Sequence, residues 1–114
     1  MSIPKAMPRR ETVTVVSTQC EKNVELTNDS GLHMIPAQLI CELACGFESA
    51  VSLHVGDTCL DAKVFLNLLG QAIEKGTIIT VRASGPDACD AVDAIVALVE
   101  SEFDQDVAKR LREG

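Results

Sequence analysis

The sequence predicts an α+β domain in which helices cover one face of an antiparallel sheet. Segments with the alternating pattern of strands and segments with the period of helices follow one another in the order βαββαβα. The connections between them are short and contain the Gly, Asp and Asn residues of hairpins and tight turns. The length of 114 residues fits one domain that buries its own core.

Four segments are expected to be strands. They span residues 23–27, 51–55, 59–62 and 77–83. In the first, Val24 and Leu26 fall on one face, as in a half-buried strand. A further β-forming segment over 12–18 is either an extra strand or an arm that pairs with another chain.

Three segments are expected to be helices, over residues 34–45, 64–69 and 87–103. The first has Pro36 in its first turn, where a missing N–H costs nothing, and Gly46 as its stop. Its predicted core stripe is Ala37, Ile40, Cys41 and Ala44. The stripe of the last helix is Ala88, Ala91, Val92, Ile95, Leu98, Val99 and Glu102. The charged residues 104–114 are expected to be helical at first and then frayed.

The charge distribution excludes several classes of partner. Seventeen acidic residues against ten basic ones give a net charge of −7, and residues 23–108 hold only three of the basic ones. A phosphate backbone or an anionic membrane would be repelled, so we expect no nucleic-acid partner. No apolar run reaches the roughly 20 residues of a membrane helix, and residues 1–10 lack the apolar core of a secretory signal. We therefore expect a cytoplasmic protein without membrane insertion.

The five cysteines lack the paired CxxC spacing of zinc sites, so no metal is expected. We expect reduced thiols that mostly act as small apolar fillers. Cys41 and Cys45 would share one helix face, which leaves a metal or redox pair as an alternative.

One segment, residues 31–37, places His33 directly before a helix that begins with a proline. The first amides of a helix lack internal partners and carry partial positive charge, so they can hold a phosphoryl group on the imidazole. A neutral histidine is a competent nucleophile at neutral pH. The alternative is an ordinary histidine at a helix entry.

This segment resembles the HPr family, the histidine phosphocarriers of the phosphoenolpyruvate:sugar phosphotransferase system (PTS). The family motif G-L-H-x-R-P-A reads G-L-H-M-I-P-A here. Further matches in register are Ala44, Gly46-Phe47, Ala62-Lys63, Gly70, Lys75-Gly76-Thr77, Gly85 and Asp87. The resemblance covers residues 22–103 and implies an open-faced β-sandwich, a four-stranded antiparallel sheet covered by three helices. Residues 1–21 would be an N-terminal extension and residues 104–114 a tail.

The resemblance implies a carrier rather than a self-contained enzyme, and it implies no cofactor. His33 would accept a phosphoryl group from phospho-enzyme I and pass it to an enzyme IIA or a related protein. The helix N-terminus formed by Met34, Ile35 and Pro36 would support that group.

Three departures from the family separate this chain from an ordinary carrier. The family's active-site arginine is Ile35, and its regulatory serine is Val64, which has no hydroxyl to phosphorylate. The positions of the family's basic docking residues hold Glu42, Cys45 and Asn67. The losses of arginine and serine leave a second hypothesis open, a protein-binding or regulatory module that keeps the fold.

Apolar residues replace the basic docking residues. The predicted partner surface is Ile35, Leu39, Leu43, Leu66 and Leu69, with core burial of these leucines as the alternative. A homo-oligomer formed through residues 12–18 is a third hypothesis. The second histidine, His54, is expected to face solvent or to be structural.

Overall fold

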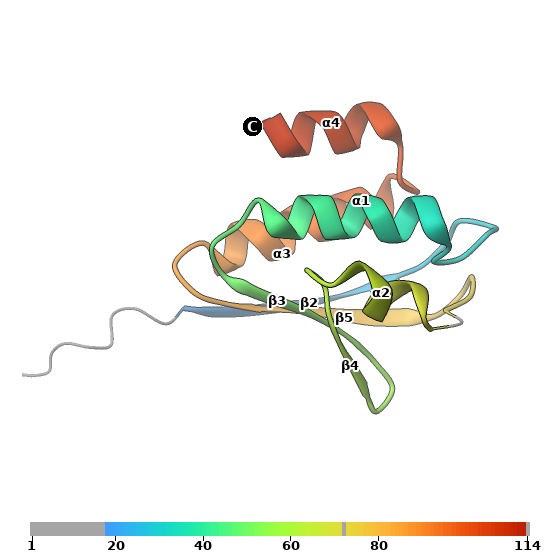
Figure 1. The fold of residues 1–114 in the computed structure, drawn as a ribbon, viewed down its shortest axis with the longest axis horizontal. Coiled ribbons are helices and arrows are strands. Elements are labelled where there is room, and N and C mark those ends of the chain that lie inside the picture. The colour runs from blue at the N-terminus through green and yellow to red at the C-terminus, as the bar shows by residue number, and fades with distance from the viewer. Residues whose placement is uncertain (1–17, 72, 114) are drawn as a thin grey trace, which may run out of the picture.

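A computed structural model describes residues 18–71 and 73–113, and Figure 1 shows the arrangement of its elements. They are β2 (Gln19–Glu25), α1 (Met34–Cys45), β3 (Ala50–Val55), β4 (Thr58–Asp61), α2 (Phe65–Leu69), β5 (Ile78–Ser84), α3 (Ala88–Glu100) and α4 (Gln105–Glu113). Apart from Thr18, the β-forming segment 12–18 lies outside the described residues.

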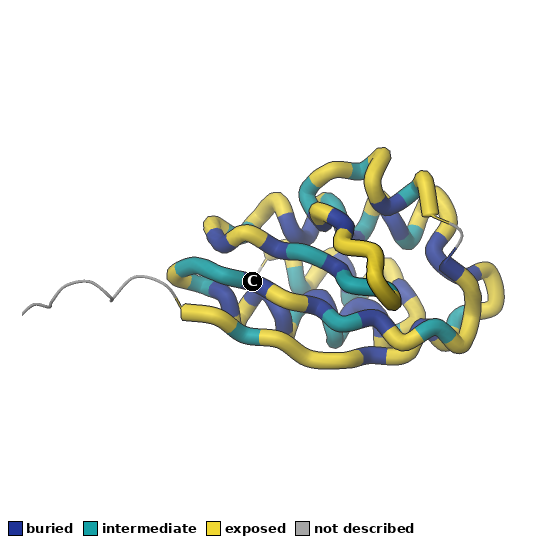
Figure 2. The backbone as a smooth tube through the Cα atoms, turned by 90° about the horizontal axis from the view of Figure 1, so that it is seen from below, coloured by how far each residue is buried: buried dark blue, intermediate teal, exposed yellow. Residues whose placement is uncertain are grey.

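The strands form one antiparallel sheet in the order β2-β5-β3-β4. Helices α1, α2 and α3 cover one face of this sheet, and the other face is open (Figure 1). Figure 2 looks at the molecule from the sheet side, where buried and more exposed positions alternate along the central strands β5 and β3. The predicted open-faced β-sandwich is therefore confirmed.

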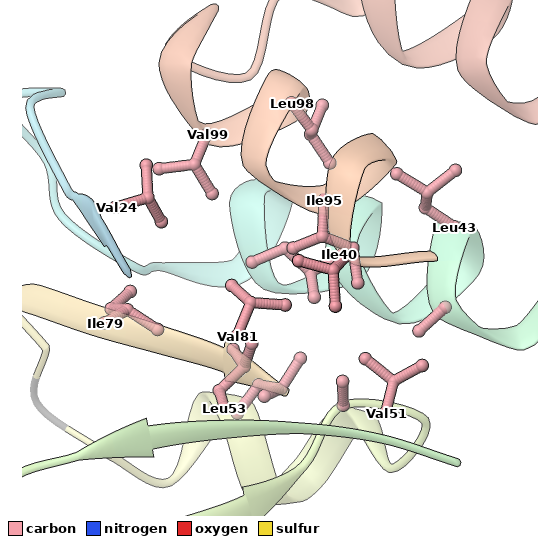
Figure 3. Packing of buried hydrophobic residues seen from close by; sticks show 14 of the residues in the cluster. Val24, Ile40, Leu43, Val51, Leu53, Ile79, Val81, Ile95, Leu98 and Val99 are labelled. Atoms are coloured by element: carbon pink, nitrogen blue, oxygen red, sulfur yellow. The ribbon is translucent and has the colours of Figure 1, made fainter. Parts of the chain in front are cut away.

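The core lies between the sheet and the helices. Leu53, Ile79 and Val81 of the sheet face Ile40 and Ile95 of the two long helices (Figure 3). The predicted stripe of α3 is confirmed, because six of its seven members are buried: Ala88, Ala91, Val92, Ile95, Leu98 and Val99. Glu102 is exposed because the helix ends at Glu100.

The first strand differs from the prediction. It was expected over residues 23–27, but β2 runs from Gln19 to Glu25. The reason is its partner, because β5 extends to Ser84, and Gln19 pairs with Ser84 at the far end of the ladder. The predicted alternation is confirmed, since Val24 is 6% exposed and Leu26 is fully buried.

The C-terminal residues form a helix that packs back on the domain. Asp104 stands before α4, and its carboxylate accepts the N–H groups of Asp106 and Val107 at 2.9 and 3.2 Å. This side chain satisfies amides that would otherwise lack partners at the start of the helix. Ala108 and Leu111 pack against the core, and α4 contacts α1 and α3. The helix continues to Glu113, so the predicted fraying within 105–113 is not seen.

Asp87 connects the start of α3 to the segment before β3. Its carboxylate accepts hydrogen bonds from the Ser49 hydroxyl and from the N–H groups of Ser49 and Glu48. The hydroxyl and the Glu48 N–H hold the pKa of this carboxyl below its ordinary value. Gly85 lets the two segments approach this closely, because a Cβ at that position would lie 2.6 Å from Ser49 Oγ.

We expect Asp87→Asn to reduce the acid sensitivity of folding. The folded-state pKa is lowered, so the stabilisation is complete above the unfolded value of about 3.9 and is lost as pH falls through the folded value. Urea denaturation of both proteins from pH 6 to pH 3 measures this. The variant should unfold more easily at pH 6 but lose less stability on acidification. Asp57→Asn in the exposed β3–β4 turn is the control, and an equal effect there would contradict the assignment.

Candidate functional site

The loop before α1 holds the backbone of His33 in place. Gly31 has φ +68°, and the N–H of Leu32 donates to the carbonyl of Ile73 at 2.8 Å. The side chain of Asn28 donates to the Gly31 carbonyl at 2.8 Å. Leu32 is buried, so the residue next to the histidine is anchored in the core.

His33 occupies the N-cap position of α1. Its backbone is extended, and its carbonyl accepts the first helical hydrogen bond, from Ala37 at 2.9 Å. The side chain is exposed and makes no capping bond, so the ring is accessible. The predicted helix over 34–45 is confirmed at both ends. The N–H groups of Met34 and Ile35 belong to the first turn and have no helical acceptor, and Pro36 has no N–H.

Electrostatics at this helix end favour an anion. The first turn of α1 contains no acidic residue, so the partial positive charge of the amides is not neutralised within the turn. A shallow hollow of about 450 Å³ lies beside the ring. It is lined by Ser30, Leu32, His33, Met34, Leu69, Gln71, Ile73 and Glu74. Glu74 is the acidic residue of this lining, so the positive charge of the site comes from the amide groups at the start of α1.

A set of exposed apolar side chains lies on α1, on α2 and at the residue before α2. It consists of Met34, Ile35, Val64 and Leu66, which are 61%, 55%, 42% and 72% exposed. These residues belong to or immediately precede α1 and α2, two helices that contact each other. We call this set the apolar patch.

The apolar patch differs from the predicted partner surface. Ile35 and Leu66 are exposed as predicted, and Leu39 and Leu69 are half-buried. The prediction is wrong for Leu43, which is 3% exposed and lies in the core beside Ile95 and Leu98 (Figure 3). The reason is that α3 packs against this side of α1.

The departures in charge are visible on the surface. Glu42, Cys45 and Asn67 are all exposed. Glu42 is paired with Arg112 of α4 at 3.1 Å, a contact that the sequence analysis missed. The amphipathic pattern of α4 was the signal that could have predicted this packing. Lys63 is near Cys45, and its ammonium donates to the Phe47 carbonyl at 2.7 Å.

The cysteine prediction needs correction. All five thiols are free, but Cys45, Cys59 and Cys89 are exposed and therefore do not fill the core. Cys41 is half-buried rather than a full member of the core stripe. Within residues 18–71 and 73–113, no three His, Cys, Asp or Glu side chains gather as a metal ion would require. In the same part of the chain, no helix has both the length and the apolar character needed to cross a membrane.

The sequence matches one protein family over most of its length. The matching family is PTS-HPr, described as "PTS HPr component phosphorylation site", and the match covers residues 20–101. The phosphocarrier protein NPr of Escherichia coli K12 is 38% identical over 87 residues, which are 75% of this chain and 97% of that protein. The phosphocarrier protein HPr of Vibrio cholerae is 35% identical over 80 residues, which are 70% and 94% of the two chains.

Solved structures agree with these matches. HPr-C-His from Thermoanaerobacter tengcongensis superposes with a TM-score of 0.71 at 30% identity, covering 74% of this chain and 94% of that one. The swapped Crh dimer of Bacillus subtilis gives a TM-score of 0.59 at 33% identity, with coverage of 72% and 94%. Fold and sequence together define a phosphocarrier of the PTS. The chain belongs to the HPr family.

Proposed function

We propose that this protein is a cytoplasmic carrier that accepts a phosphoryl group on His33 from phospho-enzyme I. It then passes the group to an enzyme IIA or a related protein. The observation that carries the proposal is an exposed imidazole at the N-cap of a 12-residue helix, with no side-chain capping bond. That ring is free to act as a nucleophile, and the amides that follow it are free to receive an anion.

The transfer is an in-line displacement at phosphorus. A neutral nitrogen of the His33 ring attacks, a bond from nitrogen to phosphorus forms, and the bond from phosphorus to the donor breaks. The donor leaves with the electron pair of that bond. The N–H groups of Met34 and Ile35 lie next to the negative charge on the phosphoryl oxygens. Onward transfer reverses these roles.

The apolar patch is the proposed docking surface for both partners. Met34 and Ile35 of the patch directly follow His33, and a partner that covers them would also exclude water from the reacting group. A docking surface made of basic residues, as in the family, attracts an acidic partner over a long range and so raises the rate of association. In this chain Glu42 stands at one of those basic positions and is paired with Arg112. Apolar contact, rather than long-range charge attraction, is therefore expected to hold the partner. We therefore expect association to depend weakly on salt.

Intact-mass analysis tests the proposal. The protein is incubated with phosphoenolpyruvate and the enzyme I of the same genome, and then measured with and without an acid quench. We expect one phosphoryl adduct that is lost in acid, because phosphohistidine is acid-labile. His33→Ala should abolish the adduct completely. His54→Ala is the matched control, because these are the two histidines of the chain, and it should keep the adduct. An adduct that survives in His33→Ala would refute the proposal.

The second candidate is a protein-binding module that keeps the fold without phosphotransfer. It is favoured by the 55% exposure of Ile35 at the family's arginine position. It predicts a complex whose recovery from source-cell extract is equal for the wild type and His33→Ala. Loss of that complex in His33→Ala favours the carrier. Two matched structures are described as dimers, so the solution mass should be measured on the same samples.

A further inference from the structure

The open face of the sheet carries a second group of chemically reactive side chains. In β3, Val51 and Leu53 point into the core, so Ser52 and His54 occupy the outer face. In β4, Leu60 is buried, so Cys59 and Asp61 share that outer face. The helices and His33 lie on the other side of the sheet, and phosphotransfer uses none of these residues.

The strand register places these residues in two adjacent rows. His54 pairs directly with Cys59, and Ser52 pairs with Asp61 on one side and with Arg82 of β5 on the other. Because neighbouring strands are about 4.8 Å apart, the backbones of Asp61 and Arg82 are roughly 10 Å from each other, with Ser52 between them. One row therefore contains a thiol beside an imidazole, and the next row contains a carboxylate and a guanidinium.

The thiol and the imidazole are in contact. Cys59 Sγ lies 3.7 Å from His54 Nε2, and Ser52 Oγ lies 2.9 Å from the same nitrogen. With the ring proton on Nδ1, Nε2 accepts from both groups and can take the proton of the thiol. Cys59 is exposed, so a reagent in solution can reach the sulfur. An imidazole that accepts the thiol proton is a common activator of a cysteine nucleophile.

A hollow of about 390 Å³ adjoins the thiol. Its wall includes Cys59, Asp61, Asn67 and Arg82. Arg82 also forms an ion pair with Glu21 at 2.7 Å, and its side chain remains 50% exposed. The Asp61 carboxylate and the Arg82 guanidinium line the same hollow, so together they can bind the ammonium group and the carboxylate of one ligand, such as an α-amino acid.

The other four cysteines have less favourable surroundings for nucleophilic attack. Burial raises the pKa of Cys41, and a hydrogen bond with the half-buried Cys20 raises that of Cys89. Both effects keep the thiol protonated. Cys41 and Cys45 share the Lys63 carbonyl as acceptor, at 3.4 and 3.8 Å, and a carbonyl oxygen cannot take a proton. Among the described residues, Cys59 is the cysteine that contacts a histidine.

We propose that Cys59 is a modification site for thiol–disulfide exchange with small disulfides of the cystine class, whose halves carry both an ammonium group and a carboxylate. His54 takes the proton from Cys59 Sγ, and the sulfur attacks one sulfur of the disulfide. The new S–S bond forms as the old one breaks, and the departing thiolate takes the proton from His54. The products are Cys59 in a mixed disulfide and one free cysteine, so no further oxidant is needed.

The test is a time course of mixed-disulfide formation with cystine at pH 7, read by peptide mapping on the full chain. We expect Cys59 to react about tenfold faster than Cys45 or Cys89. His54→Gln should slow Cys59 about tenfold while leaving the rate at Cys45 unchanged. Cys45→Ser is the control that should leave the rate at Cys59 unchanged.

Two further measurements separate the fold from intrinsic reactivity. In urea, the preference for Cys59 should disappear, because the contact with His54 exists only in the folded chain. Arg82→Gln should slow the reaction with cystine but not with cystamine, which has no carboxylate. The proposal is overturned if Cys45 or Cys89 reacts faster than Cys59, or if His54→Gln, shown by circular dichroism to be folded, leaves the rate at Cys59 unchanged.

Discussion

Replacing Gly31 by alanine should lower the free energy of unfolding by about 2–5 kcal/mol. Gly31 has φ +68°, a left-handed conformation that costs a residue with a Cβ about 1–2 kcal/mol. The new Cβ would also lie 2.5 Å from the Ile73 carbonyl oxygen and 3.0 Å from Glu74 Cα. These are backbone atoms, so the clash is relieved only if the two segments move apart.

Gly56→Ala is the matched control for this substitution. Its φ is +59°, but no atom lies within 4 Å of the added Cβ. It should therefore lose only the conformational part, about 1–2 kcal/mol. Urea denaturation of the three proteins measures both effects. Equal losses would show that Gly31 is required for its φ alone and not for the close contact.

The Gly31→Ala substitution is expected to affect the site at His33 as well as stability. The segment that would be pushed away from Ile73 carries Leu32, whose N–H is bonded to Ile73, and then His33. Under the proposed function, Gly31→Ala should also slow phosphorylation of the protein fraction that remains folded. Gly56 is in the β3–β4 turn, so Gly56→Ala should leave that rate unchanged.

Replacing Ile35 by arginine should raise the rate of phosphoryl transfer to His33 about tenfold, which corresponds to roughly 1.4 kcal/mol of transition-state stabilisation. Ile35 lies in the first turn of α1 and is 55% exposed, so the substitution removes little core packing. A guanidinium two residues after His33 would offer charge-assisted hydrogen bonds to the phosphoryl oxygens. Rapid-quench measurement of the single transfer from phospho-enzyme I tests this.

Ile78→Arg is the control for the added charge. Ile78 is 53% exposed and lies on the open face of the sheet, away from His33, so the change in side chain and net charge is the same. Its transfer rate should stay within about twofold of the wild type. An unchanged or lower rate in Ile35→Arg would indicate that the partner has adapted to the apolar patch.

Local sequence signals were sufficient for the fold class. The bounds of α1 follow from the helical period between His33 and Gly46, and the structure has the same bounds. The buried stripe of α3 follows from spacing alone. These signals are reliable because a strand or a helix buries one face, and the spacing of its apolar residues identifies that face.

Contacts between segments that are far apart in the sequence could not be predicted from local patterns. The start of β2 at Gln19 depends on how far β5 extends, and the burial of Leu43 depends on where α3 packs. The pairing of Glu42 with Arg112 required α4 to fold back over α1. The amphipathic pattern of α4 indicates that one of its faces packs on the domain, but it does not specify the helix that this face contacts.

The sequence by itself determined the order of elements, the position of His33 before a helix, and the family. The tertiary structure alone decided which apolar residues remain exposed on α1 and α2 and which cysteine contacts a histidine. Exposure and side-chain proximity arise when segments far apart in the chain pack together, whereas periodicity reports only how each segment presents its own faces. The apolar patch and the contact between Cys59 and His54 are both products of that packing.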